Sequence, residues 1–179
     1  MTSPLVRLTP EELGQRARRL TWLLLDVDGV LTDGRLTYAA DGSVQKSFHT
    51  KDGFGIRLAR RAGLKVGTLS LRSDPALAHR ARELELDAVF AGRSDKGAVF
   101  EDFLAQHGVG AHEVAYAGDD WPDLPVFTRA GLAAAPADAA PEVRERAHLV
   151  LAAAAGHGAV RELVELLLKA RGDWDRLAP

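Results

Sequence analysis

The feature that most constrains this chain is a short apolar run that stops abruptly at two carboxylates. Residues 22–25 read Trp-Leu-Leu-Leu, and Asp26 and Asp28 follow with one Val between them. Such a run is typical of a strand buried on both faces of a parallel sheet, whose carboxyl end is where open α/β sheets bind ligands. Acids at this spacing point to the same side and repel each other. The pattern predicts a hard cation such as Mg²⁺ between them, with a plain acidic loop as the alternative.

Strand-like runs and helical patterns alternate along the rest of the chain. Further strands are predicted at 64–69, 87–90, 114–117, 132–135 and 148–151. Helices are predicted around them at 9–20, 52–61, 75–84, 96–107, 141–147 and 160–168. Thr9 and Asp74, each followed by Pro, are predicted to cap two of these helices. The ordering predicts an α/β fold, a three-layer doubly wound parallel sheet.

The connection after the first strand contains an insertion. Asp41-Gly42 separates two alternating segments, 35–40 and 43–49, which is a strong signal for a β-hairpin. The hairpin would expose four large apolar side chains, those of Leu36, Tyr38, Val44 and Phe48. Exposed apolar side chains on a hairpin favour aggregation unless another surface covers them. We therefore expect the hairpin, about residues 34–50, to form an oligomer contact and a wall of the active site.

Composition excludes several classes of protein. With 179 residues the chain is long enough for one domain with a good core. The formal net charge is −2 and basic residues form no block, so nothing indicates binding to nucleic acid or to an anionic membrane. No apolar run is long enough for a membrane span or a signal peptide. The lack of cysteine excludes disulfides and thiolate chemistry and fits a cytoplasmic location.

Polar residues follow several of the predicted strands. Ser70 closes the second core strand, Lys96 opens a later helix, and Asp119, Asp120 and Asp123 follow the strand at 114–117. Taken singly, these are an ordinary turn serine, a solvated lysine and an acidic loop. Taken together with Asp26 and Asp28, they supply a nucleophile, a metal site, phosphate donors and a counter-cation. These are the parts that phosphoryl transfer requires.

The ordered set resembles a known family. Asp-x-Asp-Gly-Val at 26–30, Ser70, Lys96 and Gly-Asp-Asp-x-x-Asp at 118–123 are similar to the four motifs of the haloacid dehalogenase (HAD) superfamily. More specific similarity, to the 3-deoxy-D-manno-octulosonate 8-phosphate (KDO 8-phosphate) phosphatase family, lies in the hairpin and in residues 26–34, 51–56, 118–126 and 156–162. It extends over about residues 20–172. The resemblance implies an HAD-like fold and a Mg²⁺-dependent phosphomonoesterase of lipopolysaccharide biosynthesis.

The resemblance also implies roles for individual residues. Asp26 would be the nucleophile that forms an aspartyl phosphate, and Asp28 the general acid and base. The side chains of Asp26 and Asp119 and the backbone carbonyl of Asp28 would bind Mg²⁺, while Asp120 and Asp123 would orient waters or neighbouring groups. Contacts to the substrate would come from Ser70, the backbone N–H of Leu71, Arg72, Arg80 and Lys96. Lys96 would also neutralise the nucleophile.

Two positions depart from the family pattern. Leu71 stands where a Gly usually follows the Ser or Thr, and His157 stands where a basic residue is usual. Both departures concern the substrate more than the reaction. Alternatives are therefore a phosphatase for a KDN or sialic-acid 9-phosphate, or a phenylphosphate-processing subunit. A catalytically silent sugar-phosphate-binding or assembly module is the alternative of another class.

The segment lengths bear on assembly. No stretch between Gly34 and Ser70, or between Leu71 and Lys96, is long enough for a cap domain. Resemblance to capless members implies a homotetramer, in which a neighbour's hairpin and C-terminal tail (172–179) cover each site. Residues 1–179 are expected to form a single HAD-like domain.

Overall fold

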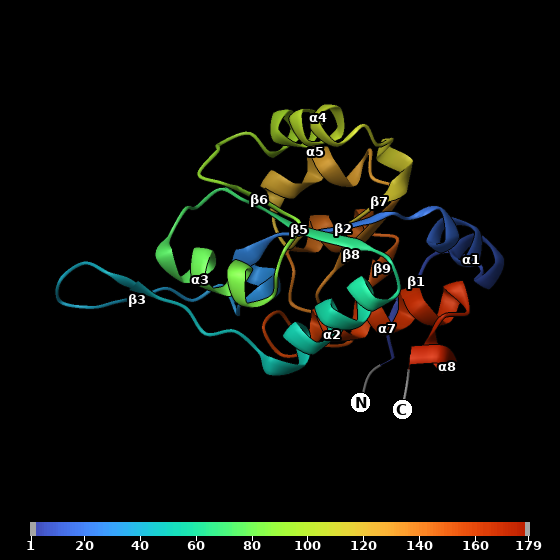
Figure 1. Cartoon of the computed structure of the whole chain (residues 1–179), viewed down its shortest axis with the longest axis horizontal. Coiled ribbons are helices and arrows are strands. Elements are labelled where there is room, and N and C mark those ends of the chain that lie inside the picture. Colours follow the sequence, from blue (N-terminus) through green and yellow to red (C-terminus); the bar gives the residue numbers. More distant parts are fainter. Residues whose placement is uncertain (1–2, 178–179) are drawn as a thin grey trace.

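The computed structural model describes residues 3–177, and its centre is one sheet. Within that range seven strands run in the order β1-β9-β8-β7-β2-β5-β6 (Figure 1). Their bounds are β1 (Leu5–Val6), β2 (Trp22–Leu25), β5 (Lys65–Ser70), β6 (Ala88–Ala91), β7 (Val114–Ala117), β8 (Leu132–Ala135) and β9 (Leu149–Val150). All neighbours are parallel except β1, which pairs antiparallel with β9. The doubly wound sheet is confirmed, and β1 is an edge strand that the sequence analysis missed.

Helices cover both faces of the sheet (Figure 1). One core holds apolar side chains of α1 (Pro10–Arg19), α2 (Thr50–Arg61), α3 (Pro75–Glu83) and α7 (Ala159–Arg171). The other holds those of α4 (Lys96–His107), α5 (Leu124–Phe127) and α6 (Pro141–Arg146). β2 contributes to both, because alternate residues of a strand face opposite sides: Leu23 and Leu25 lie in the first core, Trp22 and Leu24 in the second. The strand that precedes the two carboxylates is therefore buried on both faces.

Side-chain caps fix where the helices begin. Thr9 accepts a hydrogen bond from the Glu12 N–H at 3.2 Å, and the Glu12 carboxylate accepts one from the Thr9 N–H at 2.8 Å. Asp74 Oδ1 accepts the Leu77 N–H at 2.9 Å, so both predicted caps are confirmed. Asp95 caps α4 in the same way, which fixes the position of Lys96 on its first turn.

The hairpin between β2 and α2 is shorter than predicted. Its strands β3 (Thr37–Tyr38) and β4 (Val44–Gln45) pair over two residues each, and Figure 1 shows them extending away from the sheet beside α3. Tyr38 is 63 % exposed, whereas Phe48, at the base of the hairpin, packs against the core and under the Arg80 guanidinium. The short pairing reflects the lack of a third strand to extend it. No cap domain is present in residues 3–177, as expected.

The C-terminal segment folds back onto its own chain. Helix α8 (Trp174–Leu177) places the Trp174 ring about 5.5 Å from the cationic groups of Arg161 and Lys169 on α7. The part of the expected tail within the described residues therefore packs on α7, and residues 178–179 lie outside them. None of the helices in residues 3–177 is both long and apolar enough to span a membrane.

Candidate active site

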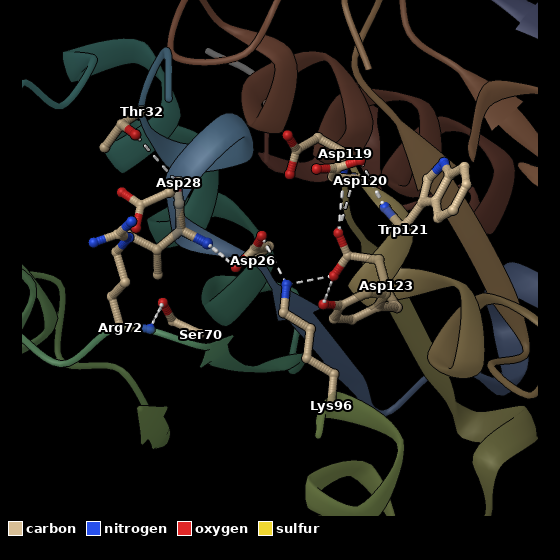
Figure 2. Close-up of polar contacts among 12 residues, drawn as sticks. Asp26, Asp28, Thr32, Ser70, Arg72, Lys96, Asp119, Asp120, Trp121 and Asp123 are labelled. Carbon is tan, nitrogen blue, oxygen red and sulfur yellow. Dashed lines mark hydrogen bonds and ion pairs between the residues drawn. The ribbon is translucent and has the colours of Figure 1, made fainter. Parts of the chain in front are cut away.

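The carboxyl end of β2 places Asp26 at the centre of a group of polar side chains (Figure 2). The Asp26 N–H continues the sheet by donating to the Ala117 carbonyl of β7 at 2.9 Å. Its carboxylate, 6 % exposed, accepts the N–H of Val27 at 2.7 Å. Burial raises the pKa of Asp26 to about 6 against the attraction of Lys96, and the charge of Asp123 adds to the rise. The strand thus presents a buried carboxylate held in one orientation.

The turn after β2, Val27–Leu31, brings its backbone against Asp119. Gly29 has φ = 89°, a conformation that residues with a Cβ rarely adopt. A Cβ at Gly29 would also overlap the Asp119 carboxylate. Glycine is therefore required here for two reasons, and it allows the β2 and β7 loops to meet.

Lys96 links two of the carboxylates. Its ammonium lies 2.8 Å from Asp26 Oδ2 and 2.5 Å from Asp123 Oδ1, and the residue is 3 % exposed. Burial by itself would lower the pKa of Lys96, but the charges of Asp26 and Asp123 outweigh burial and raise it. Lys96 therefore stays positively charged inside the site.

Asp123 is fully engaged by donors. Oδ1 accepts from Lys96 and, at 2.5 Å, from the Tyr116 hydroxyl, while Oδ2 accepts the N–H groups of Asp119 and Asp120 at 2.9 and 3.1 Å. Both of its oxygens are thus occupied, and it is completely buried. Asp123 fixes the loop that carries Asp119 and Asp120 and holds Lys96 in place.

Three carboxylates of the site lie close enough together for a divalent cation. Asp26, Asp119 and Asp123 each offer an oxygen, and these oxygens lie within 4.8 Å of one another. Burial raises the pKa of Asp119 to about 8, and repulsion from Asp26 and Asp123 contributes. Carboxylates that repel one another in a buried place are stabilised by a hard cation with oxygen ligands. Because Asp123 is occupied by other donors, the side chains free to bind Mg²⁺ are those of Asp26 and Asp119.

The β5 end faces Asp26 from the other side (Figure 2). Ser70 is 2 % exposed, and its Oγ accepts the Arg72 N–H at 3.2 Å. Leu71 is 37 % exposed and lines the same hollow of about 140 Å³. Pro122 and all of the predicted site residues except Arg80 line it as well. The geometry is that of a small anionic hollow with hydroxyl, N–H and cationic groups on its rim.

Comparison with known proteins places this arrangement in a family. No family model matches the chain, but curated relatives do. The chain is 40 % identical over 158 residues to the KDO 8-phosphate phosphatase KdsC of Haemophilus influenzae, which covers 88 % of each protein. It is 39 % identical to KdsC of Escherichia coli over 160 residues, covering 89 % of this chain and 85 % of the relative. The chain belongs to the KDO 8-phosphate phosphatase family.

Solved structures extend this relationship to the fold. A KDO 8-phosphate phosphatase from Moraxella catarrhalis, solved with magnesium, phosphate and KDO, superposes with a TM-score of 0.90 at 31 % identity, covering 93 % of this chain and 95 % of that one. A probable YrbI family phosphatase from Pseudomonas syringae gives 0.90 at 44 % identity, covering 93 % and 94 %. A related structure from Legionella pneumophila is described as an HAD superfamily hydrolase. The expected superfamily is thereby confirmed.

Arg80 and His157, which the sequence analysis singled out, do not line the hollow at Asp26. Arg80 lies outside the hollow, where its guanidinium pairs with Glu83 at 2.8 Å and contacts the His49 carbonyl at 3.4 Å. Its contact with the substrate stays a prediction. His157 Nδ1 contacts the Ala155 carbonyl at 2.8 Å. It lines a separate hollow at the base of the hairpin.

Asp120 lies at the rim. Its Oδ1 accepts the N–H of Trp121 at 2.8 Å, and the Trp121 side chain is 63 % exposed beside it (Figure 2). Asp120 thus holds the turn that follows β7.

Sequence reasoning missed two buried groups of the site. Tyr116, which donates to Asp123, reads in the sequence as one more apolar strand residue. Lys46, which follows β4, reads as a solvent-facing hairpin lysine, yet its side chain is fully buried against Asp28 and Asp74. The available signal for Tyr116 was a hydroxyl in a strand predicted to be wholly buried, because buried hydroxyls find partners. Lys46 has no such signal, since its partners lie far away in the sequence.

Proposed function

We propose that this protein is a Mg²⁺-dependent phosphomonoesterase that hydrolyses KDO 8-phosphate through an aspartyl phosphate on Asp26. The observation that carries the proposal is the buried Asp26 carboxylate, held between the Lys96 ammonium and the carboxylate of Asp119. The names of the curated relatives and the KDO complex of the Moraxella structure support the substrate. The reaction proceeds in one domain comprising residues 1–179, with the hairpin as a flap of about residues 34–50.

Asp26, Asp119 and the backbone carbonyl of Asp28 would hold the magnesium ion. When bound, Mg²⁺ supplies positive charge that offsets the repulsion between the phosphate and the carboxylates. Lys96 supplies a second positive charge from the opposite element, α4. An anionic nucleophile can then approach an anionic phosphate.

In the first step Asp26 acts as a nucleophile. Its carboxylate oxygen forms a bond to phosphorus while the bond from phosphorus to the sugar oxygen breaks. Asp28 donates a proton to the departing oxygen, which leaves as the sugar alcohol. Ser70 Oγ and the Leu71 N–H donate to the phosphate oxygens, and Arg72 lies on the same side of the hollow.

In the second step water replaces the nucleophile. Asp28, now a carboxylate, accepts a proton from the water as its oxygen bonds to phosphorus. The bond from phosphorus to Asp26 breaks and inorganic phosphate forms. Asp123 keeps Lys96 and the Asp119 loop in place through both steps.

Phosphate release from a panel of esters tests the proposal. The panel contains KDO 8-phosphate, a KDN and a sialic-acid 9-phosphate, phenyl phosphate and a nucleotide, each with Mg²⁺ and with chelator. We expect turnover to be greatest on KDO 8-phosphate and to need Mg²⁺. Asp26→Asn should lower kcat by about 10⁴-fold or more. Asp41→Asn, an exposed acid at the hairpin tip, is the matched control and should change nothing.

The same panel separates the alternatives. A preference for another ester, with the same dependence on Mg²⁺ and Asp26, would keep the mechanism and replace the substrate. Phosphate binding by a folded protein that releases no phosphate from any ester would favour the silent binding module.

We also propose assembly into a homotetramer through the hairpin, in the cytoplasm. The exposed Tyr38 ring, with Val44 opposite it on the neighbouring strand, supports a contact between subunits at the hairpin. Light scattering coupled to size exclusion should give a mass of about four chains for the native protein and a smaller mass for Tyr38→Asp. A monomeric native protein would contradict the assembly.

Fractionation of the native host should find the protein among the cytoplasmic enzymes, and recovery in the membrane pellet would contradict the location.

A further inference from the structure

Lys46, directly after β4, connects the hairpin to the proposed acid and base of the reaction. Its ammonium lies 2.8 Å from Asp28 Oδ1 and 3.0 Å from Asp28 Oδ2. It also lies 2.6 Å from Asp74 Oδ2. The Lys46 side chain is fully buried although the hairpin itself is largely exposed. A lysine on a surface hairpin is therefore held between carboxylates from two other elements.

Lys46 stays positively charged between Asp28 and Asp74, and its ammonium is held in one position. Burial alone would lower the pKa of Lys46, but its hydrogen bonds and attraction to Asp28 and Asp74 outweigh burial and raise it. Asp74 is itself anchored, because its other oxygen caps α3 through the Leu77 N–H. The position of the ammonium is thus set by the hairpin, which carries Lys46, and by the cap of α3. Since it contacts both oxygens of Asp28, it restrains rotation of that carboxylate.

We propose that Lys46 is a positioning residue, which holds the Asp28 carboxyl group where it can exchange a proton with the ester oxygen. The inference rests on the proposed function. A general acid must lie within hydrogen-bond reach of the departing oxygen, and small misplacements of such groups are costly. Lys46 does not line the hollow at Asp26, and its ion pairs are with Asp28 and Asp74, so its effect on the reaction would be exerted through Asp28.

A merely structural role for Lys46 is the alternative. β3 and β4 pair over two residues each, so a buried ion pair at the hairpin base could serve only to tether it. The two roles differ in how they depend on the leaving group. A sugar alkoxide needs a proton to depart, whereas p-nitrophenolate departs readily without one. A misplaced Asp28 therefore slows sugar esters selectively, while a displaced hairpin slows every ester.

The test compares kcat/KM for KDO 8-phosphate and p-nitrophenyl phosphate, because this ratio covers the steps up to departure of the leaving group. Lys46→Met keeps the aliphatic stem and removes the charge. We expect it to lower kcat/KM about 10²-fold for the sugar ester and less than about threefold for the nitrophenyl ester. Lys46→Arg should recover most of the loss. Lys51→Met, the same change at an exposed lysine, is the matched control and should leave both values unchanged.

A second variant keeps the inference decidable if Lys46→Met fails to fold. Asp74→Asn retains a good helix cap but loses the charge that anchors Lys46. It should also lower kcat/KM selectively for the sugar ester, but by a smaller factor, about fivefold. Equal losses on both esters, or no loss on either, would overturn the positioning role. If the native protein hydrolyses neither ester in an Asp26-dependent way, the proposed function itself fails, which is a different result.

Discussion

Two hollows among the described residues differ in size and in the charges that line them. A hollow of about 590 Å³ lies between α2, the start of β5 and the end of α3. The hollow at the carboxyl ends of β2, β5 and β7 measures about 140 Å³. Four basic and three acidic side chains line the first, so its charges nearly balance. Five acidic and two basic side chains line the second, and several of them are buried.

Burial decides what these charges can do. In the large hollow Arg60 pairs with Glu85 at 2.9 Å and with Asp87 at 3.4 Å, but the Glu85 side chain is 78 % exposed. Water screens such pairs, and they contribute little. In the small hollow Lys96 is almost wholly buried, and burial raises the pKa of Asp26 to about 6 and that of Asp119 to about 8. Unbalanced, buried charge, and not volume, distinguishes the hollow that we propose as the active site.

Replacing one cation in each hollow should give the largest contrast. Lys96→Met removes the charge that compensates Asp26 and the incoming phosphate, so kcat/KM for KDO 8-phosphate should fall by about 10³-fold. Arg60→Met should leave it within about twofold. Steady-state kinetics gives kcat/KM for the native protein and for both variants. Similar losses in the two variants would show that the large hollow also takes part in turnover.

The pH dependence of Mg²⁺ binding should sharpen the contrast further. Below pH 8 the metal-free protein holds a proton on Asp119, which Mg²⁺ must displace. Apparent affinity should therefore rise about tenfold per pH unit between pH 6 and 8 and then level off. Titration calorimetry measures this, with Asp119→Asn as the variant expected to bind weakly at every pH. An affinity that is independent of pH would contradict the raised pKa.

The same shift has a consequence for stability. A carboxyl group whose pKa is higher in the folded state than in the unfolded state stabilises the fold at low pH, and that contribution is lost as pH rises. In chelator, the unfolding temperature should therefore fall between pH 5 and 8. Added Mg²⁺ should restore it most strongly at pH 8. A curve that rises with pH in chelator would show that other groups dominate.

Tyr116→Phe should have a smaller effect. The change removes the hydroxyl that donates to Asp123 and leaves the ring in the core. A hydrogen bond to a charged acceptor contributes about 1.5–3 kcal/mol, so the free energy of unfolding should fall by about that amount. Urea denaturation gives the value, and Phe127→Leu, at the ring that packs edge-on against Tyr116, separates packing from hydrogen bonding. An unchanged free energy for Tyr116→Phe would mean that Lys96 and the backbone N–H groups satisfy Asp123 alone.

The smallest effect is expected at the large hollow. Glu85→Gln removes a partner of Arg60 that is mostly exposed, and the free energy of unfolding should change by less than about 1 kcal/mol. The urea assay used for Tyr116→Phe measures it. A loss as large as that of Tyr116→Phe would break the distinction between the two hollows.

The sequence predicted features that depend on residues close together in the chain, or on the regular geometry of a parallel sheet, better than features that depend on distant residues. Helix starts at Thr9 and Asp74 were predictable because a cap side chain and the backbone N–H that donates to it lie within three residues. The meeting of Asp26, Ser70 and Asp119 followed from the parallel sheet, whose strand ends converge at one edge. β1 escaped notice because two residues carry no periodicity. Lys46 escaped because its place depends on contacts 18 and 28 positions away in the chain, with Asp28 and Asp74.

The exposed Trp121 gives the site a built-in optical signal. The chain has three tryptophans; Trp22 is buried in the core and Trp174 packs on α7, so Trp121 is the one whose indole lies open to solvent beside Asp120. An indole in water emits at longer wavelength than one in an apolar core. The red edge of the intrinsic fluorescence therefore comes mainly from Trp121, and soluble quenchers reach it first. Occupancy of the neighbouring hollow can be followed by emission in the unlabelled native enzyme, with Trp22 as an internal reference.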